Sequence, residues 1–179
     1  MNSRLRKSIL LKLIYTLYSL TDFNKGYKTK IMHEKQYFTE NDFHNTKAIL
    51  ECSSIFFETT EALDEMIQNG QILFYQAKET IIQQHTSDQD VFFILEGLFD
   101  ISIDGNSIAV HGASDILGEM AIVDSDARRT ATVTSKEASA VLKIEEEKFV
   151  SIANMYPKIW QNIAAEIARR LRKISGINI

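Results

Sequence analysis

The sequence predicts a mainly β protein with flanking helices, in which the strands form a β jelly roll, also called a double-stranded β-helix. Between residues 71 and 145, short runs rich in β-branched and aromatic residues follow one another at regular intervals. Turn residues separate the runs, notably Asp104-Gly105-Asn106 and His111-Gly112. Before and after this region, apolar residues recur at helical spacing. Many short, evenly spaced strands are typical of a sandwich or barrel, among which we expect a jelly roll.

The first 35 residues form a basic arm on an acidic body. The arm carries eight Lys and Arg residues against two acidic residues, so its charge is about +6. With a net charge of −4 for the whole chain, the remainder holds about −10. Apolar residues at helical spacing predict a helix over 9–20, which is too short for a membrane span of roughly 20 residues, and a loop over 21–30. We therefore expect a basic helical extension over 1–44 and a second domain over 45–179.

Two further helices are predicted before the strands. A capping box at its start predicts a helix over 39–52. Another is expected over 55–69, with Thr59 or Thr60 as its N-cap and Gly70 as its end.

The strands and a final helix complete the expected elements. Asp-Gly-Asn between two of the strand runs predicts a hairpin. A helix is expected to begin at the only proline, Pro157, because proline suits a first helical turn. The predicted strands lie in the runs 71–76, 80–84, 91–97, 98–104, 107–112, 130–135 and 140–145. The apolar stripe of the final helix is Ile159, Ile163, Ile167, Leu171 and Ile174.

The segment LGEMA and the arginine that follows it suggest a binding site. Gly118 lets the backbone approach a ligand closely, because it has no Cβ. A helical turn over 119–124 would direct free N–H groups at an anion. Arg129 can add a two-pronged contact to phosphate oxygens, and Glu119 can accept a hydrogen bond from a sugar hydroxyl. This combination fits a phosphorylated sugar, and a cyclic sugar phosphate in particular. The alternative is a surface loop with a Glu–Arg ion pair.

This part of the chain resembles the phosphate-binding cassette of the cyclic-nucleotide-binding domain family. In that family an apolar residue and Gly-Glu-(Leu/Met)-Ala precede a short helix and Arg-(Ser/Thr/Ala)-Ala-(Thr/Ser)-Val. The resemblance extends over about 45–175 and implies a jelly roll with N-terminal helices and a C-terminal lid helix. The matching residues are Leu117-Gly118-Glu119-Met120-Ala121 and Arg129-Thr130-Ala131-Thr132-Val133.

The resemblance implies a role for each cassette residue. Gly118 and Ala121 would offer backbone N–H groups, and Glu119 would hold the ribose 2′-hydroxyl. Arg129 would bind the cyclic phosphate. Arg128 remains an alternative, because many family members have one residue fewer in between.

Residues outside the cassette core are implied as well. Thr130 would meet either a guanine amino group or the phosphate, and the final helix would close over the base with Arg170 and Ile174. Two departures from the family affect turns. Ser114 stands where the family has Gly, and so does His85, which removes a residue that tolerates positive φ. The expected ligand-binding residues are Leu117, Gly118, Glu119, Met120, Ala121, Arg128, Arg129, Thr130, Ala131, Arg170 and Ile174.

The expected function is that of a regulatory sensor that binds cAMP or cGMP. Its signal would pass through the C-terminal helix and the basic arm to a protein effector or a second copy of the chain. The alternative is a degenerate domain that serves as an interaction module without nucleotide. Contact of the arm with anionic lipid is left open.

Other functional classes are not favoured. The four histidines are scattered rather than clustered as in a metal-binding cupin, so no metal is expected. No Ser/His/Asp set or acid pair indicates an enzyme. Little chain follows Ile174, so we expect no helix-turn-helix and no nucleic-acid partner. The single cysteine, Cys52, fits a reducing, cytoplasmic location.

Overall fold

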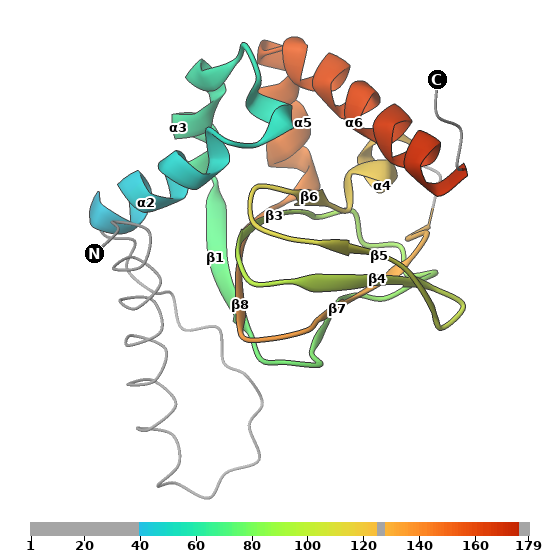
Figure 1. The fold of residues 1–179 in the computed structure, drawn as a ribbon. Coiled ribbons are helices and arrows are strands. Elements are labelled where there is room, and N and C mark those ends of the chain that lie inside the picture. The colour runs from blue at the N-terminus through green and yellow to red at the C-terminus, as the bar shows by residue number, and fades with distance from the viewer. Residues whose placement is uncertain (1–39, 125–127, 176–179) are drawn as a thin grey trace, which may run out of the picture. The chain divides into compact units, whose positions relative to one another are not determined.

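A computed structural model describes residues 40–124 and 128–175, with side chains for 42–124 and 128–173. These residues belong to one compact unit, Phe38–Ile179. Two four-stranded sheets form its centre, with strand orders β1-β8-β3-β6 and β2-β7-β4-β5 (Figure 1). All the recorded strand pairs are antiparallel. This arrangement confirms the predicted jelly roll.

Each predicted run contains one strand, and one further strand is present. The two-residue strand β6 lies directly before Gly118 and is too short to show a period of its own. The predicted hairpin joins β4 and β5 through Asp104 and Gly105, whose φ angles are +50° and +80°. The strands are β1 (Gly70–Tyr75), β2 (Thr80–Ile82), β3 (Val91–Glu96), β4 (Phe99–Ile103), β5 (Asn106–His111), β6 (Ile116–Leu117), β7 (Thr132–Ser135) and β8 (Ser139–Ile144).

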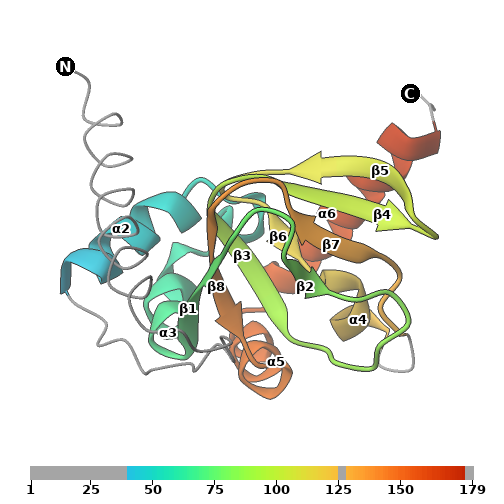
Figure 2. The ribbon, with the colours of Figure 1, turned by 90° about the horizontal axis from the view of Figure 1, so that it is seen from below.

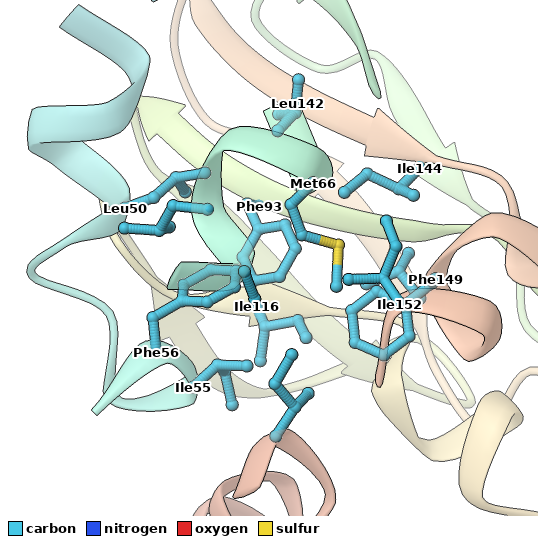
Figure 3. Close-up of a cluster of buried hydrophobic side chains, with 14 of the residues drawn as sticks. Leu50, Ile55, Phe56, Met66, Phe93, Ile116, Leu142, Ile144, Phe149 and Ile152 are labelled. Carbon is cyan, nitrogen blue, oxygen red and sulfur yellow. The ribbon is translucent and has the colours of Figure 1, made fainter. Parts of the chain in front are cut away.

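Strand β3 is buried on both faces and separates two hydrophobic clusters. Phe92 and Ile94 belong to the cluster that includes residues of both sheets. Phe93 and Leu95 belong to the cluster that also includes residues of the helices, which Figure 1 shows gathered on one side of the sheets. Figure 3 shows this second cluster, in which the rings of Phe56 and Phe93 lie 5.3 Å apart. An unbroken apolar run is therefore needed in β3.

The helix expected over 39–52 is confirmed as α2 (Glu40–Leu50), but the single helix expected over 55–69 is wrong. Glu58 has a φ of +57°, a left-handed conformation that interrupts helical winding. Thr59 makes no capping hydrogen bond with its side chain, and Gly70 begins β1. The region instead contains η1 (Ser54–Phe56), η2 (Thr60–Ala62) and α3 (Leu63–Gln68).

Helix α5 (Glu146–Met155) has no counterpart among the predicted elements. Its buried residues are Phe149, Ile152 and Ala153, which make a stripe of only one turn within a polar segment. A periodicity this short does not distinguish a helix from a loop.

The predicted final helix is confirmed as α6 (Lys158–Ser175), but its apolar stripe is only partly buried. Ile159 and Ile163 are fully buried, whereas Leu171 is 59% exposed. Residues four apart differ by roughly 40° around a helix, so a strict four-residue stripe turns away from the core. Glu166, seven residues after Ile159, returns to within roughly 20° of its direction and is buried instead.

The turns that lack glycine keep the left-handed conformation. Ser114 has a φ of +75° and His85 a φ of +70°. The Ser114 hydroxyl donates to the Ile49 carbonyl at 3.0 Å, and the His85 N–H donates to the Arg129 carbonyl at 2.8 Å. Such bonds hold conformations that cost roughly 1–2 kcal/mol in a residue with a Cβ.

Some predictions fall outside the described residues. They are the helix over 9–20, the loop over 21–30 and the side chain of Ile174. The expected boundary at residue 44 falls inside α2, and the division into 1–44 and 45–179 stays a prediction. No helix within 40–124 and 128–175 is long and apolar enough to cross a membrane.

Candidate functional site

Gly118 lies at the centre of the candidate site, between β6 and the short helix α4 (Glu119–Val123). Its φ of +82° favours glycine. A Cβ at this position would lie 2.5 Å from Arg129 Nη1 and 2.8 Å from the Asp90 carbonyl oxygen, both closer than van der Waals contact allows. The glycine therefore lets the backbone meet the arginine that lies eleven residues further along the chain.

Arg129 is 3% exposed and is held by four hydrogen bonds. Nε and Nη2 donate to the same Asp88 carboxylate oxygen at 2.9 and 2.6 Å. Nη2 also donates to the Asp90 carbonyl at 2.7 Å, and Nη1 to the Gly118 carbonyl at 3.1 Å. Burial raises the pKa of Asp88, but the hydrogen bonds from Thr86 and Arg129 and the Arg129 charge hold it below its usual value.

Glu119 is 5% exposed and forms an ion pair with Arg170 of α6. Arg170 Nη1 donates to Glu119 Oε1 at 2.7 Å, and Arg170 Nη2 donates to the Ile116 carbonyl at 2.9 Å. Figures 1 and 2 show α4 beside the C-terminal half of α6. Burial raises the pKa of Glu119, and the charge of Arg170 opposes this effect.

A second buried carboxylate holds Arg170 from within α6. Glu166 is 6% exposed and accepts hydrogen bonds from Arg170 Nε at 2.8 Å and from Arg169 Nε at 2.9 Å. Hydrogen bonds from Arg169 and then Arg170 lower the pKa of Glu166 to about 2, against the opposing effect of burial. The site therefore combines the buried carboxylates of Glu119 and Glu166 with the buried Arg129 and the half-buried Arg170.

Comparisons with known proteins identify a domain family in this part of the chain. The cyclic nucleotide-binding domain family matches residues 72–156. A regulatory domain of Toxoplasma gondii PKA, solved with cAMP, superposes with a TM-score of 0.58 and 26% identity over 68% of this chain and 47% of that chain. Residues 72–156 belong to the cyclic nucleotide-binding domain family.

Two curated relatives contain a similar domain. The Pycsar effector protein BcPycTIR of Burkholderia cepacia is 36% identical over 107 residues, which cover 60% of this chain and 35% of that protein. The cAMP-activated global transcriptional regulator CRP of Escherichia coli is 26% identical over 123 residues, 66% of this chain and 59% of that protein. The chain thus spans about a third of the Pycsar effectors that it matches.

Within this cyclic nucleotide-binding domain, the two adjacent arginines are placed differently. Arg129 lies against Gly118, whereas Arg128 is exposed and donates from Nη1 to the His85 carbonyl at 3.2 Å. Of these two adjacent arginines, Arg129 is therefore the one that contacts Gly118. Thr130 is exposed, and its hydroxyl lies 3.8 Å from the Met120 sulfur.

The other expected residues of the domain lie at different depths. Leu117 belongs to the hydrophobic cluster that includes residues of both sheets, so its side chain is part of the core. Ala121 is buried, and its N–H donates to the Gly118 carbonyl at 3.3 Å. Ala131 is half-buried and packs against the same cluster as Leu117.

Asp88 and Glu166 are absent from the residues that the sequence singled out. Asp88 lies in the segment that leads into β3 and carries no recognisable motif. Glu166 did leave a signal, because it is seven residues after Ile159 and four before Arg170, on one helix face. No group of three or more potential metal-binding side chains occurs in the described part of the cyclic nucleotide-binding domain.

Proposed function

We propose that this domain binds a cyclic mononucleotide, cAMP or cGMP, and acts as a regulatory sensor. The observation that carries the proposal is the convergence of Gly118, Glu119 and Arg129. Arg129 Nη1 donates to the carbonyl of Gly118, the residue that directly precedes Glu119. A guanidinium group and a carboxylate thus flank one glycine turn, as a fused sugar and phosphate require.

Arg129 is proposed to bind the cyclic phosphate. Its Nε and Nη2 already hold an anion, because both donate to one carboxylate oxygen of Asp88. A guanidinium group can bind phosphate oxygens with the same nitrogens. The Asp88 side chain is 46% exposed, so water can solvate its carboxylate when a phosphate takes its place.

Glu119 is proposed to accept a hydrogen bond from the ribose 2′-hydroxyl, and the backbone of Gly118 and Ala121 to face the phosphate. Met120 is 42% exposed and touches Thr130, which supports a place for both beside the ligand. The resemblance implies a direct contact between Arg170 and the base. The alternative is that Arg170 acts through its ion pair with Glu119.

The output of the sensor is proposed to be a change in the packing of α6, transmitted to a protein effector or to a second copy of the chain. The domain itself is proposed to catalyse no reaction and to act in the cytoplasm, without a nucleic-acid partner. The name of the Burkholderia relative identifies an effector. We therefore extend the effector role to this chain as a proposal.

One observation favours the alternative, a domain that serves as an interaction module without nucleotide. Asp88, Asp90 and Gly118 already accept hydrogen bonds from all three nitrogens of the Arg129 guanidinium group. A ligand must replace at least the Asp88 bonds, and a module with no ligand would keep them.

Calorimetric titration with cAMP, cGMP, cCMP and cUMP distinguishes the two functions. We expect micromolar or tighter binding of at least one nucleotide. Arg129→Ala should weaken this binding by about 30-fold or more, because it removes charged hydrogen bonds. Arg128→Ala is the matched control and should change affinity by less than about threefold. Absence of binding to every nucleotide would support the interaction module.

A further inference from the structure

Ion pairs connect Glu119, the carboxylate proposed to bind the sugar, to a second buried carboxylate, Glu166 of α6. Glu119 of α4, Arg170 of α6 and Glu166 of α6 form a continuous chain of ion pairs. Arg170 donates from Nη1 to Glu119 Oε1 at 2.7 Å and from Nε to Glu166 Oε1 at 2.8 Å. The Arg170 guanidinium group thus bridges Glu119, which lies 51 residues earlier in the chain, and Glu166, which lies four residues earlier.

Three contacts fix the orientation of this guanidinium group. Besides the two carboxylates, the Ile116 carbonyl accepts a hydrogen bond from Arg170 Nη2 at 2.9 Å. The three acceptors bind three different nitrogens, so the plane of the guanidinium group is set. Arg170 could therefore reach a base only by breaking some of these bonds.

Glu166 is itself anchored to the rest of the domain. The Ser54 hydroxyl of η1 donates to Glu166 Oε2 at 3.3 Å. One turn earlier in α6, the Asn162 amide donates to the carbonyls of Ile55 and Phe57 at 2.9 and 2.8 Å. These bonds fix α6 on η1, and they place Glu166 where it can direct Arg170 to Glu119.

We infer that Arg170 and Glu166 are positioning residues for the nucleotide sugar: Glu166 orients Arg170, and Arg170 holds Glu119 ionised and turned toward the ribose 2′-hydroxyl. This inference rests on the proposed function. An ionised carboxylate accepts hydrogen bonds at both oxygens, so Arg170 can occupy Oε1 of Glu119 while a hydroxyl binds the same group. The bond to a charged acceptor is stronger than a bond to a neutral one.

The burial of Glu119 makes this support necessary. Its side chain is almost fully removed from water, and Arg170 is the cation paired with it among the described residues. An unpaired carboxylate at this depth takes up a proton or turns toward solvent. In either case it is a weaker acceptor for the sugar.

The test compares a cyclic nucleotide with its 2′-deoxy form. The wild-type chain is titrated with cAMP and 2′-deoxy-cAMP, or with the corresponding pair for whichever nucleotide binds. We expect the deoxy form to bind about 10–100-fold more weakly, because one hydrogen bond to a charged group is lost. In Arg170→Gln this ratio should fall below about fivefold, mainly through weaker binding of the ribose form.

Two further variants test the chain of contacts. Glu166→Gln keeps the shape of Glu166 and removes its charge, so the ratio should fall to a value between those of the wild type and Arg170→Gln. Arg169→Gln is the matched control. Arg169 binds the same Glu166 carboxylate, whereas the cation paired with Glu119 is Arg170, so the ratio in Arg169→Gln should stay within about twofold of the wild type. Circular dichroism verifies that each variant folds. If Arg170→Gln does not fold, the affinity ratio measured for Glu166→Gln tests the inference instead.

Each contrary result has its own meaning. Equal losses for both forms in Arg170→Gln would overturn the inference in favour of a direct base contact. A larger ratio in that variant would show that Arg170 competes with the hydroxyl, and would also overturn it. A wild-type chain that binds both forms equally well would overturn the inference while leaving nucleotide binding intact. A wild-type chain that binds no nucleotide would overturn the proposed function itself, and the inference with it.

Discussion

Arg129 and Arg170 are both largely buried arginines that bind carboxylates and contact the segment 116–119, yet the two are held in different ways. Arg129 precedes β7 and donates to two backbone carbonyls and to Asp88, which is 46% exposed. Arg170 lies on α6 and donates to one backbone carbonyl and to two carboxylates that are each about 95% buried.

The difference supports the two proposed roles, a phosphate ligand for Arg129 and a positioning residue for Arg170. The carboxylate beside Arg129 can return to water, so a phosphate can replace it at low cost. The carboxylates beside Arg170 cannot be hydrated without moving α4 or α6, so this arginine stays in place and acts through Glu119.

The largest effect on stability is expected for the loss of Arg170. Arg170→Gln should lower the free energy of unfolding by about 2–4 kcal/mol, because it leaves two buried carboxylates without a shared cation. Arg129→Gln should cost less, about 1–2 kcal/mol, because water can solvate Asp88. Urea unfolding of both variants measures the difference. A larger loss for Arg129→Gln would contradict the contrast.

The next effect concerns the turn that brings Arg129 to the site. Gly118→Ala should lower the free energy of unfolding by about 2–3 kcal/mol, because both the positive φ and the close Asp90 carbonyl oppose a Cβ. Gly105→Ala is the matched control, since its φ is +80° and a Cβ there would meet nothing within 4 Å. Thermal unfolding should show a loss of only about 1 kcal/mol for the control. Equal losses would mean that the close approach to Arg129 is unimportant.

Acid should weaken the Arg170 side of the site. The pKa of Glu166 is lowered from 4.5 to about 2 in the folded chain, so its stabilising contribution is complete above pH 4.5 and is lost as the pH falls toward 2. The loss is on the order of 1–3 kcal/mol. Glu119 has the opposite effect on the free energy of unfolding. Its pKa is raised in the folded chain, so protonation of Glu119 favours the folded state as the pH falls.

Urea unfolding between pH 6 and pH 2.5 measures this dependence. The curve should be flatter in Glu166→Gln than in the wild type. An identical slope in both proteins would show that Glu166 is not held as the structure indicates.

The smallest effect is expected at Asp88. Asp88→Asn should change the free energy of unfolding by less than about 1 kcal/mol, because the carboxylate is half exposed. It should leave cyclic-nucleotide affinity unchanged or raise it by up to about tenfold, since less competes with the phosphate for Arg129. Asp100→Asn controls for the change in net charge, because Asp100 binds Ser107 rather than an arginine. Weaker binding in Asp88→Asn would mean that Asp88 positions Arg129.

Much of the fold could be predicted from the sequence, because the strands are short, apolar and separated by turns. The elements that could not be predicted carry weak local signals. Strand β6 has two residues, α5 buries a single turn, and the left-handed conformation of Glu58 divides the region 55–69. In each case the conformation depends on contacts with distant residues, which a local pattern does not contain.

The order of amino acids is enough to predict the jelly roll and the residue types of the site: a glycine without a Cβ, a carboxylate next to it and an arginine before a strand. Which of the two adjacent arginines meets Gly118 follows from the three-dimensional fold, because it depends on the path of the backbone from α4 to β7. The fold also decides that Arg170 meets Glu119, and that Glu166 holds Arg170. Glu119 and Arg170 are 51 positions apart and become neighbours only when α6 packs against α4. Because the pair is then largely shielded from water, the attraction between the two charges is stronger than it would be at the surface.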